Sequence, residues 1–323
     1  MAGEIHMEIL EIKGNTYCID TGMTYIPFYK INEKEIIMMD SGWAEGEQAG
    51  IDELLEKNQF EVVSVICSHA HIDHIGNNSH LKSRYNCTIA MPEFEALICS
   101  STINLKVYFG NHTLSDVELH LGHMVCETDI MISDNQDRIN ICGIKFKIMH
   151  TPGHSPAHIC MITPDDVAYL GDCLISDEVM RSSKMPYAYI LREDLKSKTM
   201  LYGLRCSKYV IAHKGIYANI TQLITANIKF YKDRAEKVLR VIDYPMTMEE
   251  IMRAAIEKFH VPIRSIYRYA VIERMLKSNV EYLYESRMIK LDVDGGFLKY
   301  SRTVELPAEK RLAGAEGKIH FEG

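Results

Sequence analysis

Short apolar runs separated by polar turns recur from residue 5 to about residue 240. Alternating or β-branched apolar runs predict strands, and apolar residues at helical spacing predict helices. The expected strands fall into two groups, the first at 7–12, 16–19, 27–31, 36–39, 62–67 and 87–90, the second at 138–142, 144–149, 159–162, 167–170 and 209–212. The expected helices are 48–57, 77–85, 191–202 and 220–241. Two groups of strands with helices between and outside them favour a layered α/β sandwich.

A second region begins near Tyr244-Pro245, where the pattern changes. Its expected elements are a helix over 247–259 with Thr247 as N-cap, a helical stretch after Pro262, a helix over 274–286, and a hairpin of strands 288–291 and 297–300. Helices followed by a hairpin resemble a winged-helix domain. We therefore expect a first domain over 1–243, a winged-helix-like α+β domain over 244–304 and a flexible tail over 305–323.

Composition and charge restrict the class of protein. The formal net charge of −8 argues against binding nucleic acid or anionic membranes through overall charge. The nine cysteines form no Cys-x-x-Cys pair and several lie within apolar runs, which is typical of a reducing cytosol. The first residues lack the pattern of a secretory signal, and no apolar run approaches the length of about 18 residues expected of a membrane span. We expect a cytoplasmic protein without a membrane span.

Three histidines and an aspartate lie in the stretch His69-Ala70-His71-Ile72-Asp73-His74, directly after the apolar run 62–67. In an extended segment His69 and His71 project the same way, whereas Asp73 and His74 come where the chain turns and can face a second point. Imidazole and carboxylate are ligands for zinc, iron or manganese. Four ligands divided two and two predict a pair of divalent metal ions. The alternative is a polar loop that is histidine-rich for no chemical reason.

Three further segments each place one ligand type after an expected strand. They are His154 in Thr151-Pro152-Gly153-His154-Ser155-Pro156-Ala157-His158, where proline and glycine fix the backbone, Asp172 after 167–170, and His213 after 209–212. A lone histidine at a strand end is more often structural than a ligand, so each signal alone is weak. Together with the first stretch they predict one metal site.

Residues 94–124 mix helical and irregular patterns and predict no definite element. The interval contains His112, His120 and His123. The His-x-x-His spacing of the last two could ligate a metal, and surface histidines are the alternative that we favour.

These motifs resemble those of the metallo-β-lactamase-fold hydrolase superfamily, whose hallmark is His-x-His-x-Asp-His followed by single His, Asp and His residues. The resemblance covers residues 5 to about 240. It implies an αββα sandwich with two divalent ions at one edge of the sheets, zinc in the first place, with iron or manganese as alternatives. The ligands implied are His69, His71 and His154 for one ion, Asp73, His74 and His213 for the other, Asp172 between them, and Asp40 and His158 as supports from outside.

By this resemblance the protein is a metallohydrolase in which a hydroxide bridging the ions attacks the substrate, with Asp73 as a catalytic residue that orients the nucleophile. The zinc β-lactamases carry a cysteine where this chain has Asp172, which argues against β-lactam hydrolysis. The segment 151–158 resembles the Thr-Pro-Gly-His-Thr-x-Gly-His motif of the glyoxalase II and thioesterase-like branch, with Ala157 in place of glycine. We therefore expect hydrolysis of an ester or thioester bond in a small-molecule substrate.

Other functions stay open at the level of sequence. A metallo-β-lactamase domain followed by a winged helix also resembles the β-lactamase-like-2 group, whose members are linked to RNA cleavage, and so suggests a phosphodiesterase or ribonuclease. Residues 243–302 carry ten Lys or Arg against nine Asp or Glu, so their affinity for phosphate should be weak. A non-heme iron persulfide dioxygenase and a non-enzymatic metal- or DNA-binding regulator are further alternatives. The C-terminal domain could instead pack over the active site or form a homodimer.

The loop over 174–189 leaves Asp172 and is the expected substrate-facing segment. It contains two cationic side chains and two tyrosines, and a further cationic side chain lies next to His213 in the sequence. Such side chains could bind an anionic or aromatic substrate. The candidates are Arg181, Lys184, Tyr187, Tyr189 and Lys214, with solvated surface as the alternative for each.

Overall fold

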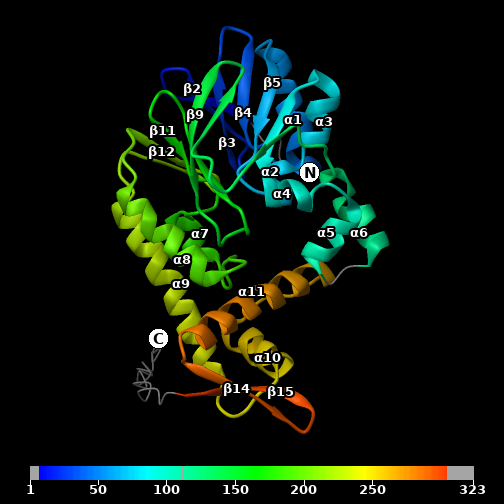
Figure 1. Cartoon of the computed structure of the whole chain (residues 1–323), viewed down its shortest axis with the longest axis vertical. Helices are drawn as coiled ribbons and strands as arrows, with labels where there is room; N and C mark the ends of the chain where they lie inside the picture. The colour runs from blue at the N-terminus through cyan, green and yellow to red at the C-terminus, as the bar shows by residue number, and fades with distance from the viewer. Residues whose placement is uncertain (1–6, 111–112, 304–323) are drawn as a thin grey trace, which may run out of the picture.

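The computed structural model describes residues 7–110 and 113–303, and its strands form two large sheets and a separate hairpin (Figure 1). The first sheet has seven strands in sequence order, antiparallel from β1 to β4 and parallel from β4 to β7. They are β1 (Glu8–Lys13), β2 (Thr16–Asp20), β3 (Tyr25–Lys30), β4 (Glu35–Met39), β5 (Glu61–Ile66), β6 (Thr88–Pro92) and β7 (Ile130–Ile132). The strands predicted for the first group correspond to β1–β6.

The second sheet has six strands in the order β13-β12-β11-β10-β9-β8. They are β8 (Arg138–Ile141), β9 (Ile144–His150), β10 (Ile159–Ile162), β11 (Val167–Tyr169), β12 (Lys208–Ile211) and β13 (Gly215–Tyr217). Neighbouring strands are antiparallel except for the parallel pair β11–β12. A tight turn at Gly143 joins β8 to β9, with φ of 50° at Cys142 and 83° at Gly143.

The helices described up to Val241 include three in the interval 94–124, for which the sequence pattern indicated no definite element. They are α1 (Ala44–Lys57), α2 (Ile72–Ile75), α3 (Asn78–Tyr85), α4 (Glu93–Ile98), α5 (Thr102–Phe109), α6 (Leu114–Leu121), α7 (Asp177–Ser182), α8 (Leu191–Met200) and α9 (Thr221–Val241), with 3-10 turns at η1 (Gly122–Met124) and η2 (Leu201–Gly203). In α5 the apolar residues Ile103 and Val107 are exposed whereas Leu105 is buried. Apolar residues on both faces hide the helical period.

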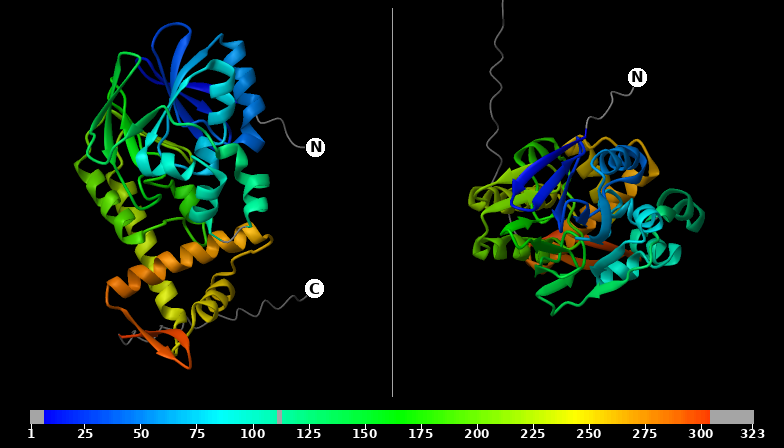
Figure 2. Two further views of the ribbon diagram at one scale, coloured as in Figure 1. Left: turned by 45° about the vertical axis from the view of Figure 1, so that its right-hand side comes forward. Right: turned by 90° about the horizontal axis from the view of Figure 1, so that it is seen from above.

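The two sheets pack face to face, and helices cover their outer faces (Figures 1 and 2). Alternation along β4 shows the arrangement: Ile37 and Met39 lie in the core between the sheets, whereas Ile36 and Met38 lie in the core beneath α1 and α3. On the second sheet, residues of β10 and β12 pack against the first half of α9. The chain therefore folds as the layered α/β sandwich that the pattern predicts, in the helix–sheet–sheet–helix order that the resemblance implies.

The described residues after Val241 form two helices and a hairpin. They are α10 (Met248–Phe259), α11 (Ile266–Glu285), β14 (Ile289–Asp294) and β15 (Phe297–Arg302). The expectation of separate helices after Pro262 and from residue 274 was wrong, because α11 runs unbroken from an N-cap at Ser265. The hairpin is confirmed, and its turn uses Gly295 and Gly296 at φ of 57° and 83°.

One apolar cluster joins these C-terminal helices to the sandwich. Leu195 of α8 and Val238 of α9 belong to the same cluster as Ile251 of α10 and Leu276 of α11. The core therefore crosses the boundary expected near residue 243. Figure 1 shows α11 running across this end of the sandwich, from the side of α8 and α9 to that of α5.

The remaining expectations about the chain as a whole concern cysteines and membranes. None of the nine cysteines forms a disulfide. No helix in the described part of the chain is long and apolar enough to cross a membrane. The tail predicted over 305–323 and the side chain of His112 lie outside the described residues.

Candidate metal centre

The candidate ligands follow the ends of strands at one edge of the sandwich. His69 follows β5, His154 follows β9, Asp172 follows β11 and His213 follows β12. Strands β9, β11 and β12 run in one direction, because β9 and β11 are each antiparallel to β10 and β11 is parallel to β12. The carboxyl ends of these three strands therefore meet at one edge, where they face the loop after β5.

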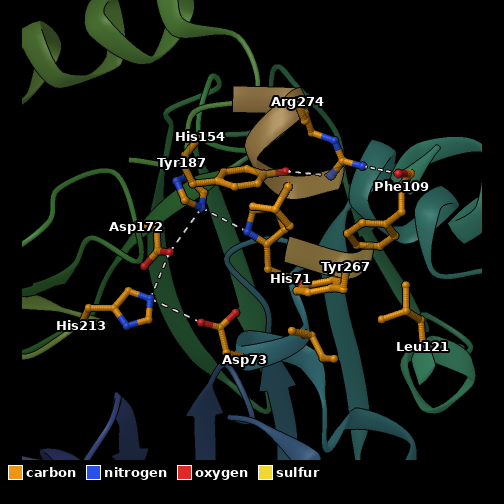
Figure 3. Close-up of a pocket in the computed structure, with 12 residues that line it drawn as sticks. His71, Asp73, Phe109, Leu121, His154, Asp172, Tyr187, His213, Tyr267 and Arg274 are labelled. Atoms are coloured by element: carbon orange, nitrogen blue, oxygen red, sulfur yellow. Dashed lines mark hydrogen bonds and ion pairs between the residues drawn. The ribbon is translucent and has the colours of Figure 1, made fainter. Parts of the chain in front are cut away.

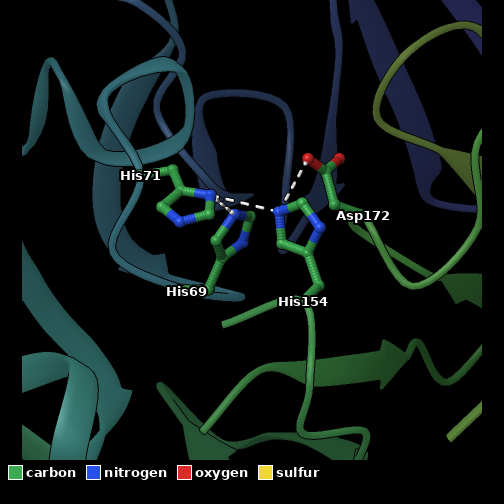
Figure 4. A group of neighbouring side chains, drawn as sticks. All are labelled: His69, His71, His154 and Asp172. Atoms are coloured by element: carbon green, nitrogen blue, oxygen red, sulfur yellow. Dashed lines mark hydrogen bonds and ion pairs between the residues drawn. The ribbon is translucent and has the colours of Figure 1, made fainter. Parts of the chain in front are cut away.

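Three imidazoles and a carboxylate form the first group of ligands (Figure 4). Nε2 of His69 lies 2.8 Å from Nδ1 of His71, which lies 3.1 Å from Nε2 of His154. Nε2 of His154 lies 3.2 Å from Oδ2 of Asp172. The four ligand atoms lie within 4.8 Å of one another, so a single ion could contact all of them.

Asp73, His74 and His213 form the second group. Oδ2 of Asp73 lies 3.4 Å from Nε2 of His213 and 3.9 Å from Nε2 of His74. Asp172 joins the two groups, because its Oδ1 lies 3.5 Å from Nε2 of His74 and its Oδ2 lies 3.3 Å from Nε2 of His213. Figure 3 shows Asp172 between His154 and His213. A carboxylate in this position can contact two cations.

Several buried polar atoms of the cluster form no hydrogen bond within the described structure. They are Nε2 of His71, Nε2 of His74, Nδ1 of His154 and Oδ1 of Asp172. A buried polar atom without a partner is destabilising, and a neutral imidazole has only one N–H with which to satisfy a neighbour. Cations placed among these atoms would give the unpaired lone pairs a partner and would make up for the shortage of N–H donors. The residues present therefore fit divalent metal ions, and imidazole with carboxylate is a donor set used for zinc, iron and manganese.

Burial lowers the pKa of the imidazoles in the first group. The pKa values of His69 and His154 lie well below the usual value, and that of His71 falls to about 4. These rings are therefore neutral at pH 7, and neutral imidazole is the form that binds a metal.

The second group lies among carboxylates, which have the opposite effect. Asp172 raises the pKa of His213 to about 10, against the effect of burial and with help from Asp73. Burial also lowers the pKa of His74, but Asp172, Asp73 and Asp40 outweigh it and raise that pKa well above its usual value. Without a metal, the second group therefore holds protons where a cation could bind, and metal binding would release them.

Asp40, directly after β4, orients His74 from outside the cluster. Its Oδ2 accepts a hydrogen bond from Nδ1 of His74 at 2.8 Å, and others from the hydroxyls of Ser68 and Tyr169, both at 2.7 Å. Its Oδ1 accepts from the backbone N–H of Ser68 at 2.6 Å. Because this acceptor places the proton of His74 on Nδ1, Nε2 is left to face the cluster.

His158 contacts Asp172 through the backbone. Nε2 of His158 accepts a hydrogen bond from the backbone N–H of Asp172 at 3.1 Å, and its Nδ1 lies 2.8 Å from the hydroxyl oxygen of Thr151. Burial lowers the pKa of His158 to about 3, so the ring is neutral and can act as this acceptor. Asp40 and His158 thus both lie where supports of the site are expected.

Glu95 of α4 connects the two histidine-bearing loops, and no sequence pattern indicated it. It is fully buried, and its carboxylate accepts from the backbone N–H of Ala70 at 2.9 Å and of Ala157 at 2.8 Å. The hydroxyl of Ser155 donates to the same carboxylate at 2.5 Å. One side chain therefore fixes the loop that carries His69 and His71 relative to the loop that carries His154.

A pocket opens at the two groups of ligands, and Tyr187 is the predicted substrate contact that lines it (Figure 3). The ring of Tyr187 packs against those of His71 and His154, with centroids 4.6 Å and 5.1 Å apart. Tyr189 is not among the lining residues and stacks on Tyr108 with centroids 5.1 Å apart.

The three predicted cationic contacts do not line this pocket. Arg181 and Lys184 are exposed, on α7 and just after it. Lys214 pairs with Asp20 at 3.2 Å. In this structure the three therefore lie outside the pocket, with Arg181 and Lys184 in solvent and Lys214 paired with a carboxylate.

The His-x-x-His pair lies apart from the metal groups found in the described residues. His120 is exposed at the end of α6, and His123 lies in η1. The favoured alternative of surface histidines agrees with the position of His120.

The pocket has a roof made by five residues from elements that the sequence pattern left out or divided: Phe109 of α5, Leu121 of α6, and Tyr267, Val271 and Arg274 of α11. The three residues of α11 are spaced by four and three positions, so they share one face of the helix. That spacing is a signal in the sequence. It was divided between two expected elements, the helical stretch after Pro262 and the helix from residue 274.

A family model matches the sequence of this chain. The model described as metallo-beta-lactamase superfamily matches residues 19–213, which is more than half of the chain. The protein belongs to the metallo-beta-lactamase superfamily, and the resemblance seen in its motifs is confirmed.

Curated relatives match at low identity. The chain is 27% identical over 195 residues to hydroxyacylglutathione hydrolase GloC of Haemophilus influenzae, a match that covers 59% of this chain and 85% of that protein. It is 31% identical over 150 residues to an uncharacterised protein of Aquifex aeolicus, covering 46% of this chain and 63% of the relative. For a hydroxyacylglutathione hydrolase of Rhodopseudomonas palustris the match covers 53% of the relative. The chain thus spans less than two thirds of some of these proteins.

Solved structures match over a larger part of the chain. A metallo-beta-lactamase family protein of Thermus thermophilus superposes with a TM-score of 0.65 at 17% identity, covering 92% of this chain and 98% of that one. A beta-lactamase domain protein of Burkholderia ambifaria gives a TM-score of 0.66 at 15% identity, with 91% and 95% covered. At these identities the likeness shows the fold alone.

Proposed function

We propose that the protein is a metallohydrolase that uses two divalent metal ions, with zinc as the first candidate, to cleave an ester or thioester bond of a small molecule. The observation that carries this proposal is the position of Asp172 between two groups of histidine and aspartate ligands. Relatives named hydroxyacylglutathione hydrolases support hydrolysis as the reaction class.

The proposed roles follow from the geometry of the cluster. One ion would be held by His69, His71 and His154, the other by Asp73, His74 and His213, and both by Asp172. When bound, two such ions would lower the pKa of a water molecule to about 7 and polarise the carbonyl oxygen of the substrate. Asp73 lines the pocket, where its carboxylate can accept a hydrogen bond from the attacking water and orient it. Tyr187 shields the rings of His71 and His154 from solvent.

Metal analysis combined with a substrate panel tests this proposal. The panel contains thioesters, lactones, bis-p-nitrophenyl phosphate, single-stranded RNA and a persulfide under oxygen. We expect two equivalents of metal and turnover of thioesters. Cleavage of RNA alone would replace the proposal with a nuclease, and oxygen consumption with one equivalent of iron would replace it with a dioxygenase.

Variants of the cluster test the assigned roles. We expect His71→Ala and Asp73→Ala to reduce thioester hydrolysis to the background rate while the protein stays soluble, because each removes a ligand and Asp73 also loses its contact with the attacking water. His120→Ala, at an exposed histidine outside the pocket, is the control and should keep full activity. Full activity in either cluster variant would contradict the assignment.

We also propose that residues 244–304 form a winged-helix-like unit attached to the catalytic part over 1–243. The order α10, α11, β14, β15 supports this description. The near balance of ten basic and nine acidic residues over 243–302 favours a role at the active site over binding of nucleic acid.

A further inference from the structure

Arg274 of α11 reaches into the pocket from the C-terminal part of the chain. Its guanidinium donates hydrogen bonds to the hydroxyl of Tyr187 at 3.2 Å and to the backbone carbonyl oxygens of Tyr108 and Phe109. The rings of Tyr108, Phe109 and Tyr189 have centroids 5.5, 5.3 and 5.9 Å from its Cζ. Arg274 therefore stands among neutral partners, at the point where α11 meets α5.

The charge of Arg274 has no counterion in the described part of the chain. Its hydrogen-bond partners there are a phenol and two carbonyl oxygens, and no described carboxylate forms an ion pair with it. A half-buried cation is destabilising unless an anion compensates it. A guanidinium has five N–H donors, of which these contacts use three. Both hydrogen bonds to the carbonyl oxygens come from Nη2, so the Nε–H and one N–H of Nη1 are left to bind an incoming anion.

The rest of the pocket is apolar near the roof and charged at the ligands. Ile72, Leu121 and Val271 contribute aliphatic surface to the lining. Two divalent ions would carry more positive charge than Asp73 and Asp172 neutralise, and Arg274 adds one more positive charge. The loaded pocket would therefore attract anions, although the chain has a net charge of −8.

The distance between this charge and the metal cluster is set by one side chain. Figure 3 shows the ring of Tyr187 between Arg274 and His154. That ring packs on His71 and His154 at one end, and its hydroxyl accepts from Arg274 at the other. A substrate that reaches both the metals and Arg274 must span about the length of a tyrosine side chain.

We infer that Arg274 is a specificity residue that binds a substrate carboxylate, and that the preferred substrates are half-thioesters or half-esters of short dicarboxylic acids. The inference rests on the proposed function and adds to it the class of acyl group. The cleaved carbonyl lies at the metal ligands, the short aliphatic chain passes along Tyr187 and the roof, and the free carboxylate pairs with Arg274.

A pair of thioesters of one thiol tests this inference. One carries a succinyl group and the other its methyl ester, in which a methyl group replaces the negative charge. The native protein should show about 10- to 100-fold higher kcat/KM for the succinyl thioester, which is the effect of a hydrogen-bonded charge pair. Arg274→Gln should lower kcat/KM for the succinyl thioester at least about 10-fold more than for its methyl ester, because only the first loses a charge pair. Arg274→Lys should keep part of the preference, because the positive charge stays and the planar arrangement of donors is lost.

A matched control separates this local effect from a change in net charge. Arg268→Gln removes one positive charge from an exposed position of the same helix, outside the pocket lining. It should keep the full preference for the succinyl thioester. Circular dichroism and thermal unfolding of each variant establish that the fold is retained.

A binding experiment on metal-free protein gives an answer that does not depend on hydrolysis. Calorimetric titration with butanoate, butanamide and inorganic phosphate should show that butanoate binds more tightly than butanamide to the native protein and to Arg268→Gln, but not to Arg274→Gln. If neither thioester is cleaved, the proposed function fails, and this titration still decides the role of Arg274.

Three results would overturn the inference. Equal loss of activity on both thioesters in Arg274→Gln would mean that Arg274 only holds α11 to α5. An unchanged preference in that variant would mean that the carboxylate binds elsewhere. Tighter binding of phosphate than of butanoate to the native protein would assign the site to another class of anion.

Discussion

At the scale of residues, the candidate metal centre depends on two buried carboxylates that are not ligands. Asp40 fixes the tautomer of His74 through a hydrogen bond of 2.8 Å, and Glu95 holds both histidine-bearing loops by their backbone N–H groups. A ligand that is held in its binding orientation before the metal arrives loses little conformational entropy on binding. We therefore expect metal affinity to respond to residues that never contact the metal.

Replacing Glu95 by glutamine tests this dependence. Each carboxylate oxygen accepts a backbone N–H, one from Ala70 and one from Ala157, so either orientation of the new amide sets an NH2 group against a donor. We expect about 1–3 kcal/mol less stability and about 10- to 100-fold weaker metal binding. Chemical denaturation and competition with a chromophoric chelator measure the two effects.

Glu93→Gln is the matched control for this variant. It makes the same chemical change in the first turn of the same helix, at an exposed position. It should leave both stability and metal affinity close to native. Similar losses in the two variants would show that the charge of α4 matters, and not the contacts of Glu95.

Removing the metal ions should destabilise the native protein. Ions that bind only the folded state stabilise it by mass action, and without them the cluster keeps buried polar atoms that lack hydrogen bonds. We expect a chelator to lower Tm by about 5–15 °C, and the added metal to restore it. In His71→Ala, which lacks one ligand, the chelator should lower Tm by less than in the native protein. If the chelator leaves the Tm of the native protein unchanged, the metal assignment is contradicted.

At the scale of elements, the segment that carries His154 is positioned by α8. The backbone N–H of Ile190 donates to the carbonyl of Gly153 at 2.9 Å, and the hydroxyl of Ser197 donates to that of Pro152 at 2.7 Å. Gly153 has φ of 128°, and a Cβ there would lie 2.0 Å from the backbone nitrogen of Asp194. The glycine thus permits the turn and also the close approach of the helix.

Gly153→Ala should therefore separate the turn from α8. Both the backbone conformation and the clash with Asp194 oppose a side chain, so we expect a loss of at least about 2 kcal/mol. Because His154 moves with the turn, the metal content measured by elemental analysis should fall as well. Gly143→Ala is the control, since Gly143 also has a positive φ of 83° but an added Cβ would meet nothing within 4 Å. Gly143→Ala should lower stability by about 1 kcal/mol and leave the metal content unchanged.

The sequence predicted those elements whose signals are local. The stretch from His69 to His74 carries four ligands in six positions, and each further ligand follows a recognisable strand, so one loop and its strand are enough to find them. Arg274 carries no such signal, because its role depends on the packing of α11 against α5, about 165 residues away in the chain. The sequence did not indicate Glu95 for the same reason. Its partners lie on two other loops, and nothing in the sequence of α4 distinguishes the buried Glu95 from the exposed Glu93.

At the scale of the whole molecule, the C-terminal helices and the sandwich share a core. Leu276 of α11 is 1% exposed and belongs to the same apolar cluster as Leu195 of α8 and Val238 of α9. Apolar contacts of this kind couple the unfolding of the parts that they join. We therefore expect the chain to unfold in one transition, in spite of the domain boundary expected near residue 243.

Trp43, the single tryptophan, makes this coupling measurable. It lies at the start of α1, in the sandwich, and its fluorescence reports the first sheet. Leu276→Ala should lower stability by about 2–5 kcal/mol and shift the transition seen by Trp43 as much as that seen by circular dichroism. Lys277→Ala, at the exposed neighbouring position, is the control. It should shift the transitions seen by Trp43 fluorescence and by circular dichroism only slightly. A Trp43 transition that stays in place in Leu276→Ala would show that the two parts unfold independently.

The origin of the pocket roof has a consequence for how such a protein is made and how it can change. Every candidate metal ligand lies between His69 and His213, whereas three of the five roof residues lie between Tyr267 and Arg274. During synthesis the ligands leave the ribosome first, so the metal centre can assemble before the part that restricts access to it exists. Over evolutionary time the same separation lets mutations in one helix alter which molecules are admitted, while the machinery that breaks the bond is inherited intact.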